Sequence, residues 1–315
     1  MQEKNNMRIV FMGTPEFAVA SLDAVVQAGF NVVGVVTAPD KPGGRGMKLQ
    51  ESAVKKYAAH KGLHILQPEK LKNPAFIEEL RALKADVQLV VAFRMLPEVV
   101  WDMPPQGTVN LHASLLPQYR GAAPINWAVI NGEKTTGVTT FKLQHAIDTG
   151  NVLLQDKIAV ADDETAGELH DRMKTIGAAL LVKTLQQLAD GTLKEMSQDH
   201  LIGNGHATLQ HAPKIFTETC KIDWAKNADE IYNLIRGLSP YPAAFSYLDG
   251  KMLKIYQGKK EITDHSSEKG SVHTDGKTFI KFACGNGFMH VLDIQLEGKK
   301  RMPVGDFLRG YRMNL

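Results

Sequence analysis

The residues with the clearest chemical potential are Asn110, His112 and Asp148. An amide, an imidazole and a carboxylate are the groups that an acyl-type transfer needs. The amide can bind a developing oxyanion, the imidazole can move a proton, and the carboxylate can orient the imidazole and favour its charged form. The alternatives are a structural histidine and an ordinary Asp-Thr-Gly turn at 148–150. The residue types therefore predict catalysis only if the three side chains meet.

The segment around His112 has the pattern of a strand that ends at a site. Apolar residues at 109 and 111 alternate with Asn110 and His112, so both polar side chains leave the same face of a strand. Pro117 and Gly121 then interrupt the run, which places His112 near the carboxyl end of its strand. Ligands bind at that edge of open α/β sheets.

The first half of the chain alternates apolar strands with helical stretches, which predicts a Rossmann-like, mostly parallel sheet in the α/β class. We expect strands at 8–12, 31–37, 64–66, 86–92, 107–112, 136–142 and 152–159, and helices after residue 15, at 51–61, near 74–83 and at 164–189. The first turn, Gly13-Thr-Pro15, lacks the glycines of G-x-G-x-x-G, so a nicotinamide cofactor is not expected.

The second half predicts a different domain. Residues 191–213 are polar and irregular and are interpreted as a linker between a catalytic domain at 1–190 and a C-terminal domain at 214–315. After one helix, short strand-like runs separated by Asp-Gly and Asn-Gly turns predict a small OB-like β-barrel. Residues 211–315 hold 16 Lys and Arg against 12 Asp and Glu, a mildly basic balance that permits contact with nucleic acid.

Composition limits the class of protein further. The 315 residues, 43% of them hydrophobic, suffice for two domains with sizeable cores. We expect a cytoplasmic protein without a membrane span, because no long apolar run or signal peptide is present. The two cysteines have no metal-ligand spacing, so neither a disulfide nor a metal site is expected.

The motif at the centre resembles that of the folate-dependent formyltransferases. The resemblance rests on the run Asn110-Leu-His-Ala-Ser-Leu-Leu-Pro-Gln-Tyr-Arg-Gly121 with its downstream Asp-Thr-Gly, and on segments 7–17, 39–46 and 221–224. It covers the chain from about residue 7 to the end. It implies formyl transfer from the co-substrate 10-formyltetrahydrofolate, without a metal, and Asn110, His112 and Asp148 as catalytic residues.

The resemblance also implies where the folate binds. The segment Ser114-Leu115-Leu116-Pro117 corresponds to the folate site, and a second segment, Phe93-Arg94-Met95-Leu96, corresponds to the wall of the pterin pocket. Arg94 departs from the pattern, because the family commonly has a glycine there. Its side chain is expected to point to solvent, to reach the folate tail, or to block part of the pocket.

The acceptor is suggested by the loop that contains Lys41, Arg45 and Lys48. This Gly/Pro-rich loop is longer than an ordinary βα turn and suits phosphates at a nucleic-acid end, although a solvated loop is the simpler alternative. The resemblance implies contact with the acceptor stem of initiator methionyl-tRNA, whose free α-amino group would be formylated for translation initiation by a monomeric enzyme. An amino-sugar or purine-precursor formyltransferase and a non-catalytic tRNA-binding protein are the competing interpretations.

Overall fold

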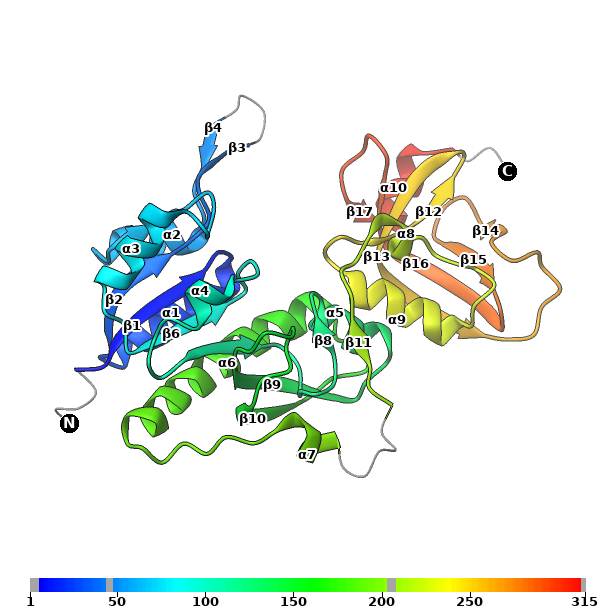
Figure 1. Cartoon of the computed structure of the whole chain (residues 1–315). Coiled ribbons are helices and arrows are strands. Elements are labelled where there is room, and N and C mark those ends of the chain that lie inside the picture. Colours follow the sequence, from blue (N-terminus) through cyan, green and yellow to red (C-terminus); the bar gives the residue numbers. More distant parts are fainter. Residues whose placement is uncertain (1–5, 44–47, 203–207, 313–315) are drawn as a thin grey trace. The chain divides into compact units, whose positions relative to one another are not determined.

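The computed structural model describes residues 6–43, 48–202 and 208–312 (Figure 1). The chain forms two compact units. Unit 1 comprises Met1–Arg120, Gly137–Ile158 and His170–Gln210, and unit 2 comprises Gly121–Thr136, Ala159–Leu169 and His211–Leu315.

Unit 1 is built on a seven-stranded sheet in the order β10-β9-β7-β6-β1-β2-β5. Its strands are β1 (Arg8–Gly13), β2 (Asn31–Val36), β5 (Ile65–Leu66), β6 (Val87–Val91), β7 (Thr108–His112), β9 (Thr135–Lys142) and β10 (Val152–Ala159). The pairs β1–β2, β1–β6, β2–β5 and β6–β7 are parallel, whereas β9 runs antiparallel to β7. The predicted mostly parallel, Rossmann-like sheet is confirmed.

The centre of this sheet is buried on both faces. Every residue of β6 is buried, as is all of β1 after Arg8, which is typical of a parallel sheet covered by helices on both sides. One core cluster joins Val10 and Val90 to Phe76 and Leu80 of the overlying helix. At the end of β1, a Cβ on Gly13 would lie 2.6 Å from that of Ala18, so only glycine lets the chain turn here into the first helix.

The helices of unit 1 largely follow the sequence pattern. They are α1 (Glu16–Gln27), α2 (Ala53–His60), α3 (Pro74–Ala82), α4 (Glu98–Trp101), α6 (Ala166–Ala189), which begins in unit 2, and α7 (Gln198–Ile202). The Gly/Pro-rich loop contains two short antiparallel strands that were not expected, β3 (Lys41–Gly43) and β4 (Lys48–Gln50). This hairpin projects from unit 1 beyond α2 (Figure 1).

Unit 2 contains a six-stranded antiparallel sheet that curls into a partial barrel, as predicted from the short strands. Its strands are β12 (Ala244–Leu248), β13 (Lys251–Ile262), β14 (Val272–Thr274), β15 (Ile280–Cys284), β16 (Gly287–Leu296) and β17 (Met302–Pro303). Register shifts around Gln257 bend the long strand β13. Helix α9 (Ala228–Leu238) buries Ile231, Ile235 and Leu238 against this sheet, and unit 2 also contains α8 (Thr217–Cys220) and α10 (Val304–Gly310).

Two segments from the first half of the chain pack within unit 2. Helix α5 (Pro124–Ile130) lies against α9, where Asn126 Nδ2 donates to the carbonyl of Gly237 at 2.8 Å. The guanidinium of Arg236, 4% exposed, donates to the carbonyls of Ala161 and Glu164 at 3.3 and 3.1 Å. The segments 121–136 and 159–169 are therefore packed into unit 2.

The segment 191–213 has more structure than the linker interpretation implies. It includes α7, a two-residue bridge between Met196 and Val152, and β11 (His211–Ala212), which pairs with β8 (Arg120–Gly121). The predicted domain boundaries at 191–213 stay a prediction. Within the described residues, no helix is long and apolar enough to cross a membrane.

Candidate active site

The imidazole of His112 is fixed at the carboxyl end of β7. It is the last residue of the strand, and only 6% of its surface is exposed. Its Nε2 lies 2.8 Å from the carbonyl oxygen of Tyr119. A carbonyl can only accept, so Nε2 carries a proton in this arrangement, and Nδ1 is the nitrogen available for proton exchange.

Asp148 approaches the other side of this ring. Its Oδ2 lies 3.9 Å from His112 Nδ1, and its side chain is 12% exposed. The loop that carries it starts beside the opposite end of β7, where Leu143 N donates to Thr108 O at 2.8 Å. Because β9 is antiparallel to β7, the loop has to fold back along the sheet before Asp148 can meet His112.

The turn at Asp148 is tightly packed. Asp148 has φ of 53°, in the left-handed region that Asp tolerates better than most residues. A Cβ on Gly150 would lie 1.6 Å from the carbonyl oxygen of Lys142, so no larger residue fits without a backbone shift. The sequence Asp-Thr-Gly thus meets two local requirements of the turn as well as supplying the carboxylate.

Asn110 shares a face of the sheet with His112. It lies two residues earlier on β7, and its register partner Phe141 on β9 contacts the His112 ring edge-on at 6.3 Å between centroids. The Asn110 side chain is half-buried and makes no hydrogen bond to any residue that the structure describes. An amide left unpaired beside an imidazole–carboxylate pair can donate to a substrate oxygen.

The segment from Ser114 to Pro117 is mostly enclosed by the protein itself. Ser114, Leu116 and Pro117 are buried, and Leu115 is partly exposed. Thr139 Oγ1 donates to the carbonyl of Ser114 at 2.6 Å, and the carbonyl of Leu116 accepts from Gln155 at 2.8 Å. The structure thus leaves Leu115 as the side chain of this predicted folate segment that is most open to a ligand.

The second predicted folate segment, Phe93–Leu96, follows the neighbouring strand β6. Val91 pairs with Leu111, so this segment leaves the sheet beside His112. Met95 is 74% exposed, whereas Leu96 is buried. A cavity of about 460 Å³ adjoins the segment and is lined by Lys70, Leu71, Lys72, Arg94, Met95, Leu96 and Pro97.

Arg94 is tied to an adjacent loop. Its guanidinium donates to the carbonyl of Glu69 at 2.8 Å and to that of Pro68, and it stacks over Phe93 at 5.5 Å from the ring centroid. The side chain therefore lies along the rim of the cavity next to Lys70 and Lys72. This arrangement places three cationic side chains around one opening.

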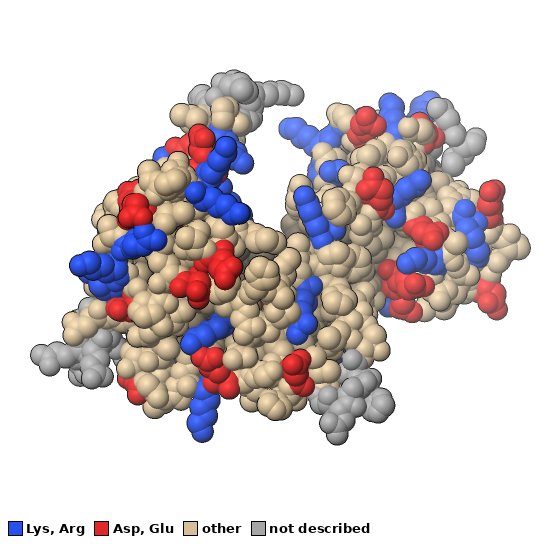
Figure 2. Space-filling model, viewed as in Figure 1, with Lys and Arg blue, Asp and Glu red and all other residues tan. Residues whose placement is uncertain are grey.

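The predicted tRNA-binding residues lie in and around the β3–β4 hairpin. Lys41 is exposed, Lys48 belongs to β4, and Arg45 lies outside the described residues. Lys55, next to the hairpin, forms ion pairs with Asp40 and with Glu51, the latter at 2.9 Å. Figure 2 shows that Lys and Arg alternate with Asp and Glu over the visible face, so charge there is mixed.

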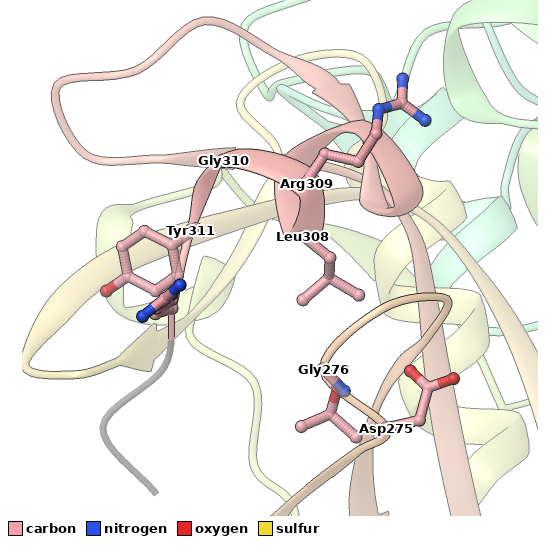
Figure 3. A pocket seen from close by; sticks show the side chains of 8 residues that line it. Asp275, Gly276, Leu308, Arg309, Gly310 and Tyr311 are labelled. Carbon is pink, nitrogen blue, oxygen red and sulfur yellow. The ribbon is translucent and has the colours of Figure 1, made fainter.

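A second cavity, of about 790 Å³, lies in unit 2 between the loop at Asp275 and the end of α10 (Figure 3). The Asp275 carboxylate accepts hydrogen bonds from its own loop, from Thr278 and from the amide of Lys277 at 2.9 Å. Arg309 points away from Asp275 in Figure 3 and pairs with Asp306 at 2.5 Å. This cavity is larger than the one beside Arg94, but its lining contains no residue of the predicted catalytic or folate-binding segments, so the site near His112 is the better candidate.

Sequence reasoning missed one polar residue of the site, Gln198. It lies in the segment interpreted as a linker, is 2% exposed, and contacts the Asp148–Gly150 turn. The surrounding sequence is polar and has no periodicity, so nothing marks this glutamine as buried. Among the described residues, no group of three or more His, Cys, Asp or Glu is arranged to hold a metal ion.

Comparisons with known proteins point to one family. Residues 7–185 match the model described as formyl transferase, and residues 214–312 match the formyl transferase C-terminal domain. A protein of Parabacteroides distasonis named methionyl-tRNA formyltransferase is 56% identical over 98% of this chain and 97% of its own length. A protein of the same name from Flavobacterium johnsoniae is 52% identical over 96% of each chain.

Solved structures share the fold at lower identity. An N-formyltransferase from Helicobacter canadensis, in complex with folinic acid and dTDP-3-aminofucose, matches with a TM-score of 0.66 and 20% identity, over 94% of this chain and 100% of that one. Glycinamide ribonucleotide transformylase 1 from Symbiobacterium toebii matches with a TM-score of 0.52 and 19% identity, over 61% of this chain and 94% of that one.

Proposed function

The chain belongs to the formyl transferase family, and on this premise we propose that it formylates the free α-amino group of initiator methionyl-tRNA, with 10-formyltetrahydrofolate as the formyl donor. The product, N-formylmethionyl-tRNA, serves translation initiation. The observation that carries the proposal is the approach of Asp148 to His112 at the carboxyl end of β7, on the face of the sheet that also carries the unpaired amide of Asn110.

The reaction joins the amine nitrogen to the formyl carbon and breaks the bond from that carbon to the folate nitrogen. A free α-amino group has a pKa of about 7.7–8.0, so part of it is already neutral and able to attack near pH 7. The carbonyl oxygen becomes an oxyanion in the tetrahedral intermediate. The Asn110 amide and the His112 Nδ1–H supply two donors for it, each typically worth roughly a hundred- to a thousandfold in rate.

The proton balance uses the same pair. Asp148 accepts the proton that the attacking nitrogen loses, through a water molecule, and protonated His112 gives one to the leaving folate nitrogen. A proton then passes from Asp148 to His112 Nδ1 through a water molecule, because the 3.9 Å separation is too long for a direct hydrogen bond, and the starting state is restored. These side chains supply the donors and the proton acceptor that the transfer needs, so the proposal includes no metal.

We place the pterin against Phe93–Leu96 and Leu115, which lie beside His112 at the sheet edge. The anionic glutamate tail then lies over the cavity lined by Lys70, Lys72 and Arg94. Of the three expectations for Arg94, contact with the tail is the one that this cationic rim supports. The buried residues Ser114, Leu116 and Pro117 form the floor behind the ligand.

The acceptor is supported by relatives at 52–56% identity that are named for methionyl-tRNA, while the sugar N-formyltransferase is only 20% identical. We assign Lys41, Arg45 and Lys48 to the acceptor stem. The chain is taken to act as a monomer in the cytoplasm, where charged tRNA is available.

The test supplies the purified chain with 10-formyltetrahydrofolate and either methionyl-tRNA or a nucleotide-linked amino sugar. Formylated product is measured by mass spectrometry. Formyl-methionine on the tRNA and no formylated sugar is the expected result. If only the amino sugar were formylated, the acceptor in the proposal would be wrong. If neither were formylated, the whole proposal would be overturned.

A further inference from the structure

Gln198 uses every hydrogen-bonding position of its side chain in unit 1. Its Nε2 donates to the carbonyl oxygens of Asp148 at 2.9 Å and of Gly150 at 2.8 Å. Its Oε1 accepts from Arg120 Nε at 3.0 Å and from Nη2 at 2.7 Å. Since a guanidinium can only donate and carbonyls can only accept, the amide has a single satisfactory orientation.

These contacts join the two chain segments that carry the proposed catalytic pair. Arg120 follows His112 in the same motif, and Asp148 and Gly150 form the turn that presents the carboxylate to the imidazole. A left-handed residue other than glycine is uncommon and persists only where its surroundings hold it. With φ of 53°, Asp148 is such a residue, and Gln198 binds its carbonyl directly.

Gln198 is itself held in place by the residues just before it. Met196 and Val152 exchange two backbone hydrogen bonds, at 2.8 and 2.9 Å, at the start of β10. Glu195 accepts from Lys142 Nζ at 2.5 Å and from Asn151 Nδ2 at 3.0 Å, at the two ends of the loop that carries Asp148. The segment 195–198 thus fixes both ends of this loop and then its turn.

We propose that Gln198 is a positioning residue for formyl transfer, which holds the 148–150 turn against Arg120 so that the Asp148 carboxylate faces His112. The inference rests on the proposed function. Gln198 makes no contact with a substrate in this role and acts only through Asp148. It therefore belongs to catalysis even though it lies 50 residues beyond the carboxylate in the chain.

The test compares Gln198→Met, which keeps the length of the side chain without its polar atoms, with Gln198→Glu, which keeps the acceptor for Arg120 but loses both donors. Gln88→Met is the matched control, because Gln88 is another buried glutamine of unit 1. It lies on β6, remote from the turn in sequence, and its Oε1 accepts from Thr108 at 3.2 Å. Each variant is also made in an Asp148→Asn background. The readouts are kcat, KM for both substrates, Tm, and peptide-level hydrogen exchange of residues 143–151.

We expect both Gln198 variants to lower kcat by roughly 100-fold, the scale of a misplacement of about 1 Å, with both KM values within about twofold. In the Asp148→Asn background the same substitutions should change kcat by less than about twofold, because they act through the missing carboxylate. Gln88→Met should leave kcat unchanged. Residues 143–151 should exchange faster in the Gln198 variants than in wild type.

Equal kcat for wild type and Gln198→Met would overturn the inference while leaving the proposed function intact. The inference would also be overturned if the Gln198 substitutions lowered kcat by the full roughly 100-fold in the Asp148→Asn background. The glutamine would then act independently of the Asp148 carboxylate. If wild type formylated neither acceptor, the proposed function would fail. In that case unchanged exchange at 143–151 would refute the positioning role without any substrate, and faster exchange would support it.

Discussion

At the scale of single residues, the two ring nitrogens of His112 have different environments. Nε2 is bound to the Tyr119 carbonyl, which fixes the ring plane, and Nδ1 faces Asp148. Because Nε2 is engaged by this carbonyl, the proposed proton exchange with substrate uses Nδ1. Substitution of His112 therefore tests both the oxyanion and the proton-transfer roles.

We expect His112→Ala to lower kcat by at least a hundredfold, because it removes one oxyanion donor and the proton donor together. Steady-state kinetics with methionyl-tRNA measure this, and circular dichroism checks that the fold persists. His64, which is half exposed and far from β7 in sequence, provides the control His64→Ala with unchanged kcat. A His112→Ala enzyme with near-normal turnover would remove His112 from the mechanism.

Gly150→Ala should damage catalysis through geometry alone. The new Cβ would lie 1.6 Å from Lys142 O, so the turn must move and carry Asp148 with it. A shift of about 1 Å would reduce kcat by roughly 100-fold. Gly305→Ala is the control, because a Cβ there meets nothing within 4 Å. If kcat and Tm of Gly150→Ala matched those of wild type, the tight packing of the turn would be irrelevant to the site.

At the scale of elements, the β3–β4 hairpin is the feature whose proposed role distinguishes a tRNA acceptor from a small one. Arg45→Ala should lower kcat/KM for methionyl-tRNA. The expected loss of transition-state stabilisation is roughly 1–3 kcal/mol, the contribution of one charge-assisted contact. The KM for folate should not change, because the segments that we propose for folate binding follow β6 and β7. Arg45→Lys should recover little if the contact is bidentate. Equal kcat/KM for all three proteins would exclude the hairpin from acceptor binding.

The sheet of unit 2 carries an ion-pair cluster whose contribution to the free energy of unfolding depends on pH. Bonds from Lys281 and then His290 to Glu261 hold the pKa of that carboxyl below its ordinary value. A depressed pKa in the folded state stabilises the fold above the unfolded pKa, about 4.3, and the effect is lost as pH falls through the folded value. Wild type should therefore exceed Glu261→Gln in Tm at pH 7, and the gap should narrow as pH falls from about 4.3 through the lower pKa of the folded state. A constant gap would contradict this linkage.

The sequence predicted these elements where local pattern decides them. The alternation at 109–112 predicted β7, and the apolar runs at 8–12 and 86–92 predicted β1 and β6. It could not predict that β9 runs antiparallel to β7, because strand direction depends on contacts between distant segments. For the same reason the fold-back of the Asp148 loop and the burial of Gln198 have no local signature. The β3–β4 hairpin was missed because its Gly and Pro content favours a loop.

At the scale of the whole molecule, the compact units do not follow the order of the chain. Segments 121–136 and 159–169 lie between elements of unit 1 in sequence, yet they pack in unit 2. They flank β9 and β10, whose connecting loop carries Asp148. Residues 211–315 thus supply the core against which the segments 121–136 and 159–169 pack, in addition to any role in binding tRNA.

Removal of residues 211–315 should therefore cost the remaining chain more than tRNA affinity. Without α9, the helix α5 loses the Asn126–Gly237 hydrogen bond and the segment at 161–164 loses Arg236. A loss of about 2 kcal/mol would lower Tm by roughly 4–8 °C in a chain of this size.

Hydrogen exchange should accelerate in 121–136 and 159–169, while β1 and β6 remain protected because both are buried on each face. Adding residues 211–315 as a separate chain should restore protection if the two pieces reassociate. Unchanged exchange in 121–136 and 159–169 after truncation would mean that these segments are stable without residues 211–315. The predicted domain boundary at 191–213 would then describe the folding units better than the two compact units do.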